Sequence, residues 1–261
     1  LLIGGGDIES ELPCLRYDSF LPKILDYKQN LQAVEQSDII YQKTNKPYKF
    51  LFLNGRYRPH RKYLIDTFRD CHLLEQSIWS NLDYGNGPTQ YLDTIYEVDL
   101  FRDNINSSDQ NFVKHDLFNN TWGEVYINPT PYIDSYFSLV TETVFTYPHS
   151  FRTEKIWKPI AIGHPWIAVS GYGYYRDIRN LGFKTFGHVI DESFDQIVDD
   201  QKRLCRIADI VTDLCQQDLA SFLKECYTVC KYNQQHLIEL GPKVQQEFPE
   251  RFFQFINNYI K

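Results

Sequence analysis

The chain has 261 residues, of which 43% are hydrophobic, and a formal net charge of -7 at pH 7. This length and composition can bury one large core or two smaller ones, as in an ordinary soluble globular protein. The acidic balance disfavours nonspecific nucleic-acid binding, because such binding depends on neutralising many phosphates. Every apolar run is shorter than the roughly 18 to 20 residues that span a bilayer, and no signal segment opens the chain, so we expect a cytoplasmic protein that is at most peripheral to a membrane.

The first residues predict a strand and a turn. Leu1–Asp7 read as a strand that ends in a glycine turn, and a weak helical periodicity follows. The three glycines do not continue into G-x-G-x-x-G or G-K-[ST], so a plain turn is a better interpretation than a phosphate-binding loop. The polar, proline-containing break at Lys43–Tyr48 is a candidate boundary.

Strands and helical segments alternate after this break. Lys49–Leu53, Tyr136–Val140 and Pro165–Val169 are predicted strands, and apolar residues at helical spacing run from His60 to Phe68. Strands separated by helical segments predict an α/β fold in which a Rossmann-like parallel sheet is flanked by helices. Between the first two strands we expect a turn at Asp83–Pro88 and surface loops over Gln90–Asn120. Another strand is expected at Val125–Asn128.

The C-terminal third is predicted to be mainly helical. Gly182 ends the first of these helices in the left-handed conformation, and Phe183–Phe186 is then a strand. Asp191 and Glu192 open the next helix, where carboxylates complement the helix dipole. In chain order, helices are expected over Tyr174–Leu181, from Asp191 to Leu214, and roughly over Asp218–Leu240 and Pro249–Ile260.

A basic loop, Asn54–Lys62, follows the first strand of the alternating region directly. It therefore lies at the carboxyl end of a strand, where open parallel sheets bind ligands. Arg61, at the start of the next helix, would offer a guanidinium fork that matches phosphate oxygens. A solvated surface loop is an equally good interpretation of this loop alone. His60 is as well explained as a hydrogen-bonded structural histidine as by catalysis.

The most informative stretch is Phe137–Val169, in which a loop enters a helix between two strands. Its charged residues fall at the helix start, where free N–H groups and the positive end of the dipole favour anions. Glu154 and Lys155 are about 100° apart on the helix, so one would face a phosphate and the other a sugar hydroxyl. Alternatively, Glu154 merely complements the dipole and Lys155 is solvated. Glu142, just beyond a strand, is a third candidate.

Missing motifs narrow the chemistry. The sequence has no D-x-D, H-E-x-x-H, G-x-S-x-G or Walker pattern. No two cysteines form C-x-x-C, and Cys226 and Cys230, four apart on a predicted helix, have no histidine in register, so buried thiols are favoured over a metal site. We therefore expect no metal, and a basic phosphate site on an α/β sheet.

Four segments carry a resemblance to a known family: YFSLVTET, RTEKIWKP, HPWIAVSG and FLFLNGRYRPHRKYLIDTF. Together they resemble the C-terminal, nucleotide-sugar-binding half of GT-B glycosyltransferases of the α1,3-fucosyltransferase type. The resemblance covers roughly Lys49–Phe186. It implies a GT-B-type fold and a metal-independent, fucosyltransferase-like transferase, which moves a sugar from a nucleotide diphosphate sugar, a GDP-sugar being one option, to a hydroxyl of a glycan or other acceptor. No cofactor is implied.

The resemblance also implies roles for particular residues. Lys155 and Arg61 would hold the donor diphosphate, Glu154 would contact the ribose or the transferred sugar, and Glu142 would lie at the donor pocket. The catalytic base, expected to be an Asp or Glu, is not identifiable. The donor-binding set also includes Arg152, and further candidates are Asn54, Arg56, Arg58, Lys158 and Tyr172.

The implied organisation has three parts. Residues 1–47 form a short N-terminal segment or a remnant of an acceptor-side domain, residues 48–214 the nucleotide-sugar-binding domain, and residues 215–261 the C-terminal helices. Because the N-terminal part is short, a noncatalytic nucleotide-binding or partner-binding module is the alternative function. A nucleic-acid-binding protein that uses the arginine loop is a weaker one. Tyr172, Tyr174 and Tyr175 either stack on sugars or fill the core.

Overall fold

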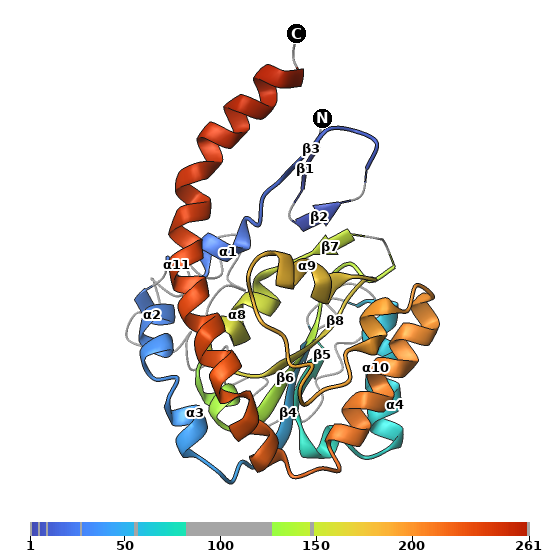
Figure 1. The fold of residues 1–261 in the computed structure, drawn as a ribbon. Coiled ribbons are helices and arrows are strands. Elements are labelled where there is room, and N and C mark those ends of the chain that lie inside the picture. The colour runs from blue at the N-terminus through green and yellow to red at the C-terminus, as the bar shows by residue number, and fades with distance from the viewer. Residues whose placement is uncertain are drawn as a thin grey trace.

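The computed structural model describes residues 2–4, 6–8, 10–26, 28–54, 57–81, 127–146 and 149–259 (Figure 1). The turn predicted at Asp83–Pro88 and the loops predicted at Gln90–Asn120 lie outside these ranges. Ile127 and Asn128 are the described end of the strand predicted at Val125–Asn128, and they are not in a strand.

A four-stranded parallel sheet forms the centre of the molecule. Its strands are β4 (Tyr48–Asn54), β5 (Ile78–Asn81), β6 (Ser135–Thr141) and β8 (Trp166–Val169), in the order β5-β4-β6-β8. Phe50, Leu51 and Phe52 of β4 are at most 4% exposed, so both faces of that strand are covered, as in sheets with helices on either side. The predicted α/β fold with a parallel sheet is confirmed.

The connections between the strands create a switch point in the middle of the sheet. The chain leaves β4 through α4 (Pro59–Asp70) and η1 (Leu74–Gln76) to reach β5 at one edge. It leaves β6 through α8 (Glu154–Ile162) to reach β8 at the other edge. The two crossovers thus diverge from the β4–β6 pair, and ligands of open α/β sheets bind at the carboxyl ends of such strands.

The helix α8 has defined signals at both ends. The Thr153 side chain is its N-cap and accepts a hydrogen bond from the Lys155 N–H at 3.3 Å. Gly163 ends the helix with a φ of 69°, a left-handed conformation that glycine adopts without a steric penalty. The helix therefore begins at the position that the sequence predicts.

The region after β8 differs from the prediction in two places. Phe183–Phe186 follows α9 (Tyr174–Asn180) as an irregular segment and pairs with none of the described strands. The Asn233 side chain bonds both the N–H and the carbonyl of Lys184, and the rings of Phe183 and Phe186 pack on Trp157 and Trp166. A short 3₁₀-helix, η4 (Ser193–Gln196), replaces the predicted start of the next helix. The helix itself, α10 (Asp200–Leu214), begins later because Asp199 is its N-cap and accepts from the Lys202 N–H.

The chain closes with one long helix, α11 (Leu219–Tyr259), where the sequence predicts two. Pro242 and Pro249 lie inside it at exposed positions, so each removes one hydrogen bond without leaving a buried carbonyl unpaired. Figure 1 shows α11 passing beside α8, which it contacts, and then projecting past the sheet. Among the described residues, no helix has the length and apolar content needed to cross a membrane.

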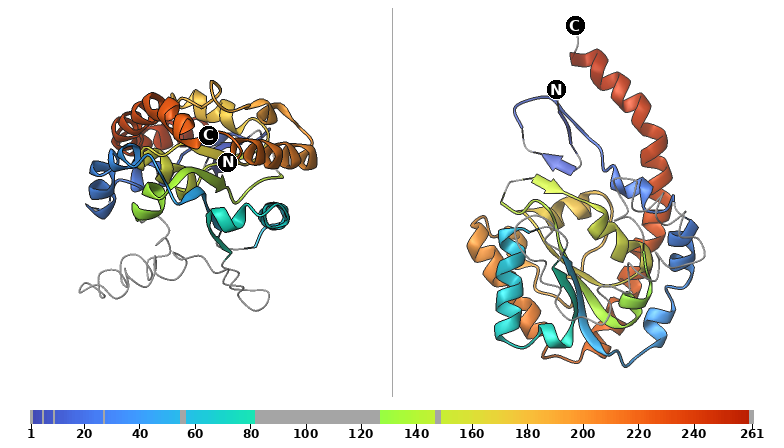
Figure 2. Two further views of the ribbon diagram at one scale, coloured as in Figure 1. Left: turned by 90° about the horizontal axis from the view of Figure 1, so that it is seen from below. Right: turned by 180° about the vertical axis from the view of Figure 1, so that it is seen from behind.

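The N-terminal segment packs on the same core as the sheet. Three short helices follow its first strands: α1 (Phe20–Lys23), α2 (Lys28–Glu35) and α3 (Ile39–Gln42). Leu21, Ile24 and Ile40 belong to one hydrophobic cluster with the sheet residues. Seen from behind, α2 and α3 lie along one side of the sheet and α4 and α10 along the other (Figure 2). A further short helix, α7 (Thr130–Ile133), precedes β6.

The first strands add two small pairings at one end of the molecule. The strand β1 (Leu2–Gly4) pairs in parallel with β3 (Cys14–Arg16). Between them in the chain, β2 (Gly6–Ile8) pairs antiparallel with β7 (His149–Phe151), which directly precedes α8. The N-terminal segment is therefore hydrogen-bonded to the strand that leads into the helix start singled out by the sequence.

Candidate functional site

The candidate site lies where β4 and β6 end. Asn54 and Thr141 are the last residues of these strands, and the Thr141 hydroxyl donates to the Asn54 Oδ1 at 2.6 Å. The Asn54 N–H donates to the Ser80 hydroxyl of β5 at 3.0 Å. Asn54 is 1% exposed, so this predicted candidate holds three strand ends together and does not present its amide to solvent.

Arg61 brings a buried positive charge to the end of β6. It is 3% exposed, and its Nη2 donates to the Thr141 carbonyl at 2.9 Å. Burial and the nearby Arg58 lower its pKa to about 10, while the carboxylates of Glu142 and Glu154 oppose that shift. The guanidinium therefore stays charged at neutral pH, close to both predicted acidic candidates.

His60 has the structural role that the sequence left open. Its Nε2 lies 3.0 Å from the Glu142 carbonyl, to which it donates, and its ring stacks on Phe145 with centroids 5.0 Å apart. Burial, followed by repulsion from Arg61, lowers its pKa to about 4. The imidazole is therefore neutral at pH 7 and fixes the start of α4 against the loop after β6.

Glu142 ties the end of β6 to the start of α8. Its side chain is fully buried and accepts from the Thr153 N–H at 3.1 Å, the Thr153 hydroxyl at 2.7 Å and the Tyr174 hydroxyl at 3.1 Å. Burial raises the pKa of this carboxyl, although Lys155 and the bonds from Thr153 oppose the rise. Glu142 thus positions the N-cap of α8 beneath the predicted donor residues.

Glu154 and Lys155 are paired, contrary to the expectation that they point apart. The Lys155 ammonium lies 2.6 Å from the Glu154 Oε1 and also donates to the Thr153 hydroxyl at 3.3 Å. The long lysine side chain bends back across the 100° that separates the two Cβ directions. Burial works against ionisation of Glu154, yet Lys155 and Lys158 hold its pKa below the ordinary value. Lys155 keeps 26% of its side chain exposed, so it remains accessible to a ligand.

Arg152 belongs to a different set of contacts from the other predicted donor residues. It is 1% exposed, and it donates to the Asp18 carboxylate through Nε at 2.7 Å and Nη2 at 2.9 Å. Its Nη1 donates to Asp7 at 2.8 Å, and Asp7 also pairs with Arg16. The side chain that was predicted to bind the donor therefore anchors the N-terminal segment.

The remaining candidates are spread around this centre. Arg58 precedes α4, and its Nη1 donates to the Tyr57 carbonyl at 2.7 Å. Lys158 lies one turn into α8 and acts on Glu154 through its charge. Tyr172 is partly exposed under the Arg176 guanidinium, 5.8 Å from its ring centre. Arg56 lies outside the described residues.

The tyrosine cluster divides between the core and the surface. Tyr174 and Tyr175 are each 1% exposed, so the core interpretation holds for both. The Tyr175 hydroxyl accepts from the Ala168 N–H at the outer edge of β8 at 2.8 Å. Tyr172 alone among the three has a ring surface that a ligand could contact.

The role of Thr153, which lies in the predicted loop-to-helix stretch, and the participation of Asp18 were not predicted. Thr153 is the N-cap of α8, and a threonine placed before a helical pattern is the sequence signal for that role. Asp18 has no comparable signal, because its partner Arg152 is 134 residues away along the chain. The carbonyl of Thr141, which receives Arg61, is likewise a feature of backbone position that residue types do not show.

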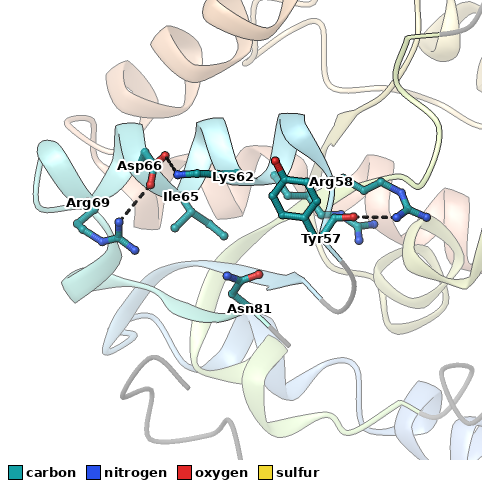
Figure 3. A pocket seen from close by; sticks show the side chains of 8 residues that line it. Tyr57, Arg58, Lys62, Ile65, Asp66, Arg69 and Asn81 are labelled. Carbon is teal, nitrogen blue, oxygen red and sulfur yellow. Dashed lines mark hydrogen bonds and ion pairs between the residues drawn. The ribbon is translucent and has the colours of Figure 1, made fainter. Parts of the chain in front are cut away.

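A pocket of about 150 Å³ borders this centre on the side of β5. Figure 3 shows Asp66 between Lys62 and Arg69, with Asn81 facing them from the end of β5. Its lining residues come from the loop before α4, one face of α4 and β5; they are Tyr57, Arg58, Arg61, Lys62, Ile65, Asp66, Arg69 and Asn81.

The arrangement is thus a parallel-sheet switch point that combines a charged guanidinium, a partly exposed ammonium at a helix start and buried carboxylates. Such a set can bind an anionic, hydroxyl-bearing ligand. No protein-family model matches the chain, and no curated protein or solved structure matches it either.

Proposed function

We propose that the protein is a metal-independent glycosyltransferase that moves a sugar from a nucleotide diphosphate sugar to an acceptor hydroxyl. The observation that carries the proposal is the meeting of Arg61 and the start of α8 at the end of β6, where Thr141 receives the guanidinium and Glu142 holds the helix N-cap. This point is the topological switch point of the sheet, the usual ligand position in open α/β folds.

Each proposed role follows from charge and position. Arg61 and Lys155 stabilise the negative charge that develops on the departing diphosphate. Because these positive groups are already held in place by the protein, little rearrangement is needed as the reaction proceeds. The free N–H groups at the start of α8 add further donors. Once a ligand phosphate draws Lys155 away, the Glu154 carboxylate accepts hydrogen bonds from hydroxyls of the ribose or of the transferred sugar. The donor is a nucleotide diphosphate sugar, a GDP-sugar among the options, and the acceptor is a glycan or another hydroxyl-bearing molecule.

A cytoplasmic, at most membrane-peripheral, location belongs to the same proposal. All six cysteines are free thiols, and three of them, Cys215, Cys226 and Cys230, are buried. Free thiols are the usual state in reducing compartments.

The donor site is tested by calorimetric titration with GDP-, UDP- and CMP-sugars. Lys155→Ala removes a charge-assisted hydrogen bond of about 1.5–3 kcal/mol, so we expect nucleotide affinity to fall by roughly 10-fold to 150-fold. Lys243→Ala is the matched control, because Lys243 is exposed on α11 and only loosely paired with Glu247 at 3.8 Å. Absence of binding to every nucleotide sugar, or equal affinities of the two variants, would refute the donor-site assignment.

A noncatalytic nucleotide-binding or partner-binding module is the second candidate. The observation that favours it is the engagement of both acidic side chains at this edge: Glu142 is buried among Thr153 and Tyr174, and Glu154 is paired with Lys155. A general base needs a carboxylate that reaches the acceptor hydroxyl. Sugar transfer or donor hydrolysis by the full chain would exclude this candidate, and tight nucleotide binding without turnover would favour it.

A further inference from the structure

We call the pocket lined by the eight residues named above the α4 pocket. Its lining carries an excess of positive charge. Four of its lining residues are cationic and one is acidic, which gives a formal charge of +3 in a chain of net charge -7. Of these residues, the proposed donor site uses Arg61, whereas Arg58, a donor candidate from the sequence, is assigned here to the pocket. From this pocket we infer an anion subsite, separate from the donor diphosphate, which takes a tetrahedral dianion such as a phosphate or sulfate group.

The charges of the α4 pocket are incompletely compensated inside the protein. Asp66 is shared between Lys62 at 2.5 Å and Arg69 at 3.1 Å, so one carboxylate faces two cations. Arg58 makes no ion pair with any residue that the structure describes, and its hydrogen bond goes to the neutral Tyr57 carbonyl. Repulsion from Arg58 also contributes to the lowered pKa of Arg61, which shows how closely the cations gather. An anion would relieve that repulsion.

The wall opposite α4 adds neutral groups that suit an oxyanion. Asn81 ends β5 and points its amide toward the α4 side chains, with Ile65 between them (Figure 3). Tyr57, 42% exposed, closes the other end of the pocket. An amide NH₂ and a phenol OH donate hydrogen bonds without adding charge, so they supply direction where the arginines and the lysine supply attraction.

The α4 pocket is large enough for a phosphate or sulfate group but too small for a whole nucleotide. Small-molecule sites usually measure roughly 300–1,000 Å³, whereas this pocket holds about 150 Å³. A phosphate or sulfate group fits into this space, whereas a whole nucleotide would have to extend out of it.

The position of the α4 pocket suggests which molecule carries the anion. Arg61 borders both the pocket and the donor site, so the bound anion lies next to the proposed donor. If the proposed transferase activity holds, the neighbouring molecule is the acceptor, and we assign the phosphate or sulfate group to it. Free inorganic phosphate is the other source of the same chemistry.

Binding of inorganic sulfate to the full-length protein, followed by calorimetry at low ionic strength, tests the subsite. We expect Arg58→Gln with Arg69→Gln to weaken sulfate binding by at least about tenfold, because two charge-assisted contacts are lost. Asp66→Asn should act in the opposite direction and tighten binding a few-fold. Lys243→Gln should leave it unchanged. Equal sulfate affinity in the wild type, the double variant and Asp66→Asn would overturn the inference.

Separation from the donor site is tested by adding GDP and by Lys155→Ala. Lys155→Ala should leave the sulfate affinity within about twofold. GDP should weaken sulfate binding a few-fold without abolishing it, because both anions lie beside Arg61. Mutually exclusive binding of sulfate and GDP would overturn the inference by making the pocket part of the donor site. These arms also distinguish the two proposals. A protein that binds sulfate in this manner but no nucleotide would refute the transferase and retain the subsite.

The source of the anion is tested in a transfer assay with hexoses, hexose 6-phosphates and hexose 6-sulfates as acceptors. We expect the anionic acceptors to have the lower KM, and the Arg58→Gln/Arg69→Gln variant to raise that KM at least about tenfold while leaving the neutral hexoses unaffected. Equal KM values for neutral and anionic acceptors in the wild type would overturn the assignment to the acceptor and leave free phosphate as the ligand.

Discussion

At the scale of single residues, the ionisable groups of the site divide between those that hold the fold and those that remain available. His60, Glu142 and Arg152 are buried, and each is bonded to protein atoms on a neighbouring segment. Lys155 keeps an exposed part, and the cations of the α4 pocket surround open space. The first group therefore fixes geometry, and the second is where a ligand changes the charge balance.

Because of His60, the free energy of unfolding should decrease as the pH falls. Its folded-state pKa of about 4 lies below the ordinary value of 6.5, so the unfolded chain binds the proton first. The contribution of the neutral ring is complete above pH 6.5 and is lost as the pH falls toward 4, at about 1.4 kcal/mol per unit. His60→Gln keeps an N–H donor for the Glu142 carbonyl but does not titrate.

We expect the difference in unfolding free energy between the wild type and His60→Gln to shrink by roughly 1–2 kcal/mol between pH 7 and pH 5, as measured by urea denaturation. The comparison of two chains cancels the pH dependence of the other groups. A difference that stays constant over this interval would show that His60 titrates normally in the folded protein.

Residue types predicted several residues that gather at the end of β6, but not the partners to which each is bonded. A basic residue at a helix start and a carboxylate after a strand are readable, and Arg61, Glu142 and Glu154 do gather at the end of β6. The bonds that assign their roles join residues 11, 32 or 80 positions apart. No local pattern encodes such separations, which is why Arg152 was placed with the donor residues and Asp18 was missed.

At the scale of secondary-structure elements, boundaries with a chemical signal were predictable and those set by packing were not. Thr153 and Gly163 fix α8, and the strands of the sheet follow apolar runs. The continuity of α11 through Pro242 and Pro249 depends on exposure of those positions, and the irregular path of Phe183–Phe186 depends on tryptophans elsewhere in the core.

The link between β7 and the N-terminal segment should be strongly stabilising. Arg152→Met leaves Asp18, 7% exposed, as a buried carboxylate without its partner, so we expect a loss of about 3–5 kcal/mol of unfolding free energy. Arg206→Met is the matched control. The ion pair of Arg206 with Asp191 is exposed on both sides and should be worth at most about 1 kcal/mol.

Urea denaturation of both variants provides the comparison, and Asp18→Asn combined with Arg152→Met should recover part of the loss because the orphaned charge is gone. Similar losses in Arg152→Met and Arg206→Met would mean that the buried pair has no special role in joining the two segments.

At the scale of the whole molecule, the C-terminal part of α11 contacts the segment at the end of β3. Tyr17, just after β3, packs on Phe248 of α11 with ring centres 4.0 Å apart, and Arg251 donates to the Arg16 carbonyl at 3.1 Å. Figure 1 shows the end of α11 beside the N-terminal strands. These contacts, with the Arg152 ion pairs, connect the projecting helix to the segment that precedes the site.

We therefore expect Phe248→Ala to loosen β1 and β3 with little effect on the sheet. Removing a half-buried aromatic ring should cost these strands about 1–2 kcal/mol of local stability, seen as faster hydrogen exchange at Cys14–Arg16. Phe253→Ala is the control, since Phe253 is 64% exposed on the same helix. Equal exchange in the two variants would argue that α11 does not support the N-terminal strands.

The ion pair between Glu154 and Lys155 has a consequence for selectivity. An approaching phosphate competes with a carboxylate on the next residue, whose effective concentration is in the millimolar range or above. Simple anions at lower concentrations are therefore poor competitors for the ammonium. A ligand that offers hydroxyls to Glu154 and a phosphate to Lys155 replaces both halves of the internal pair at once. Under the proposed function, the site would in this way reject free anions and select molecules that carry both groups at the right distance.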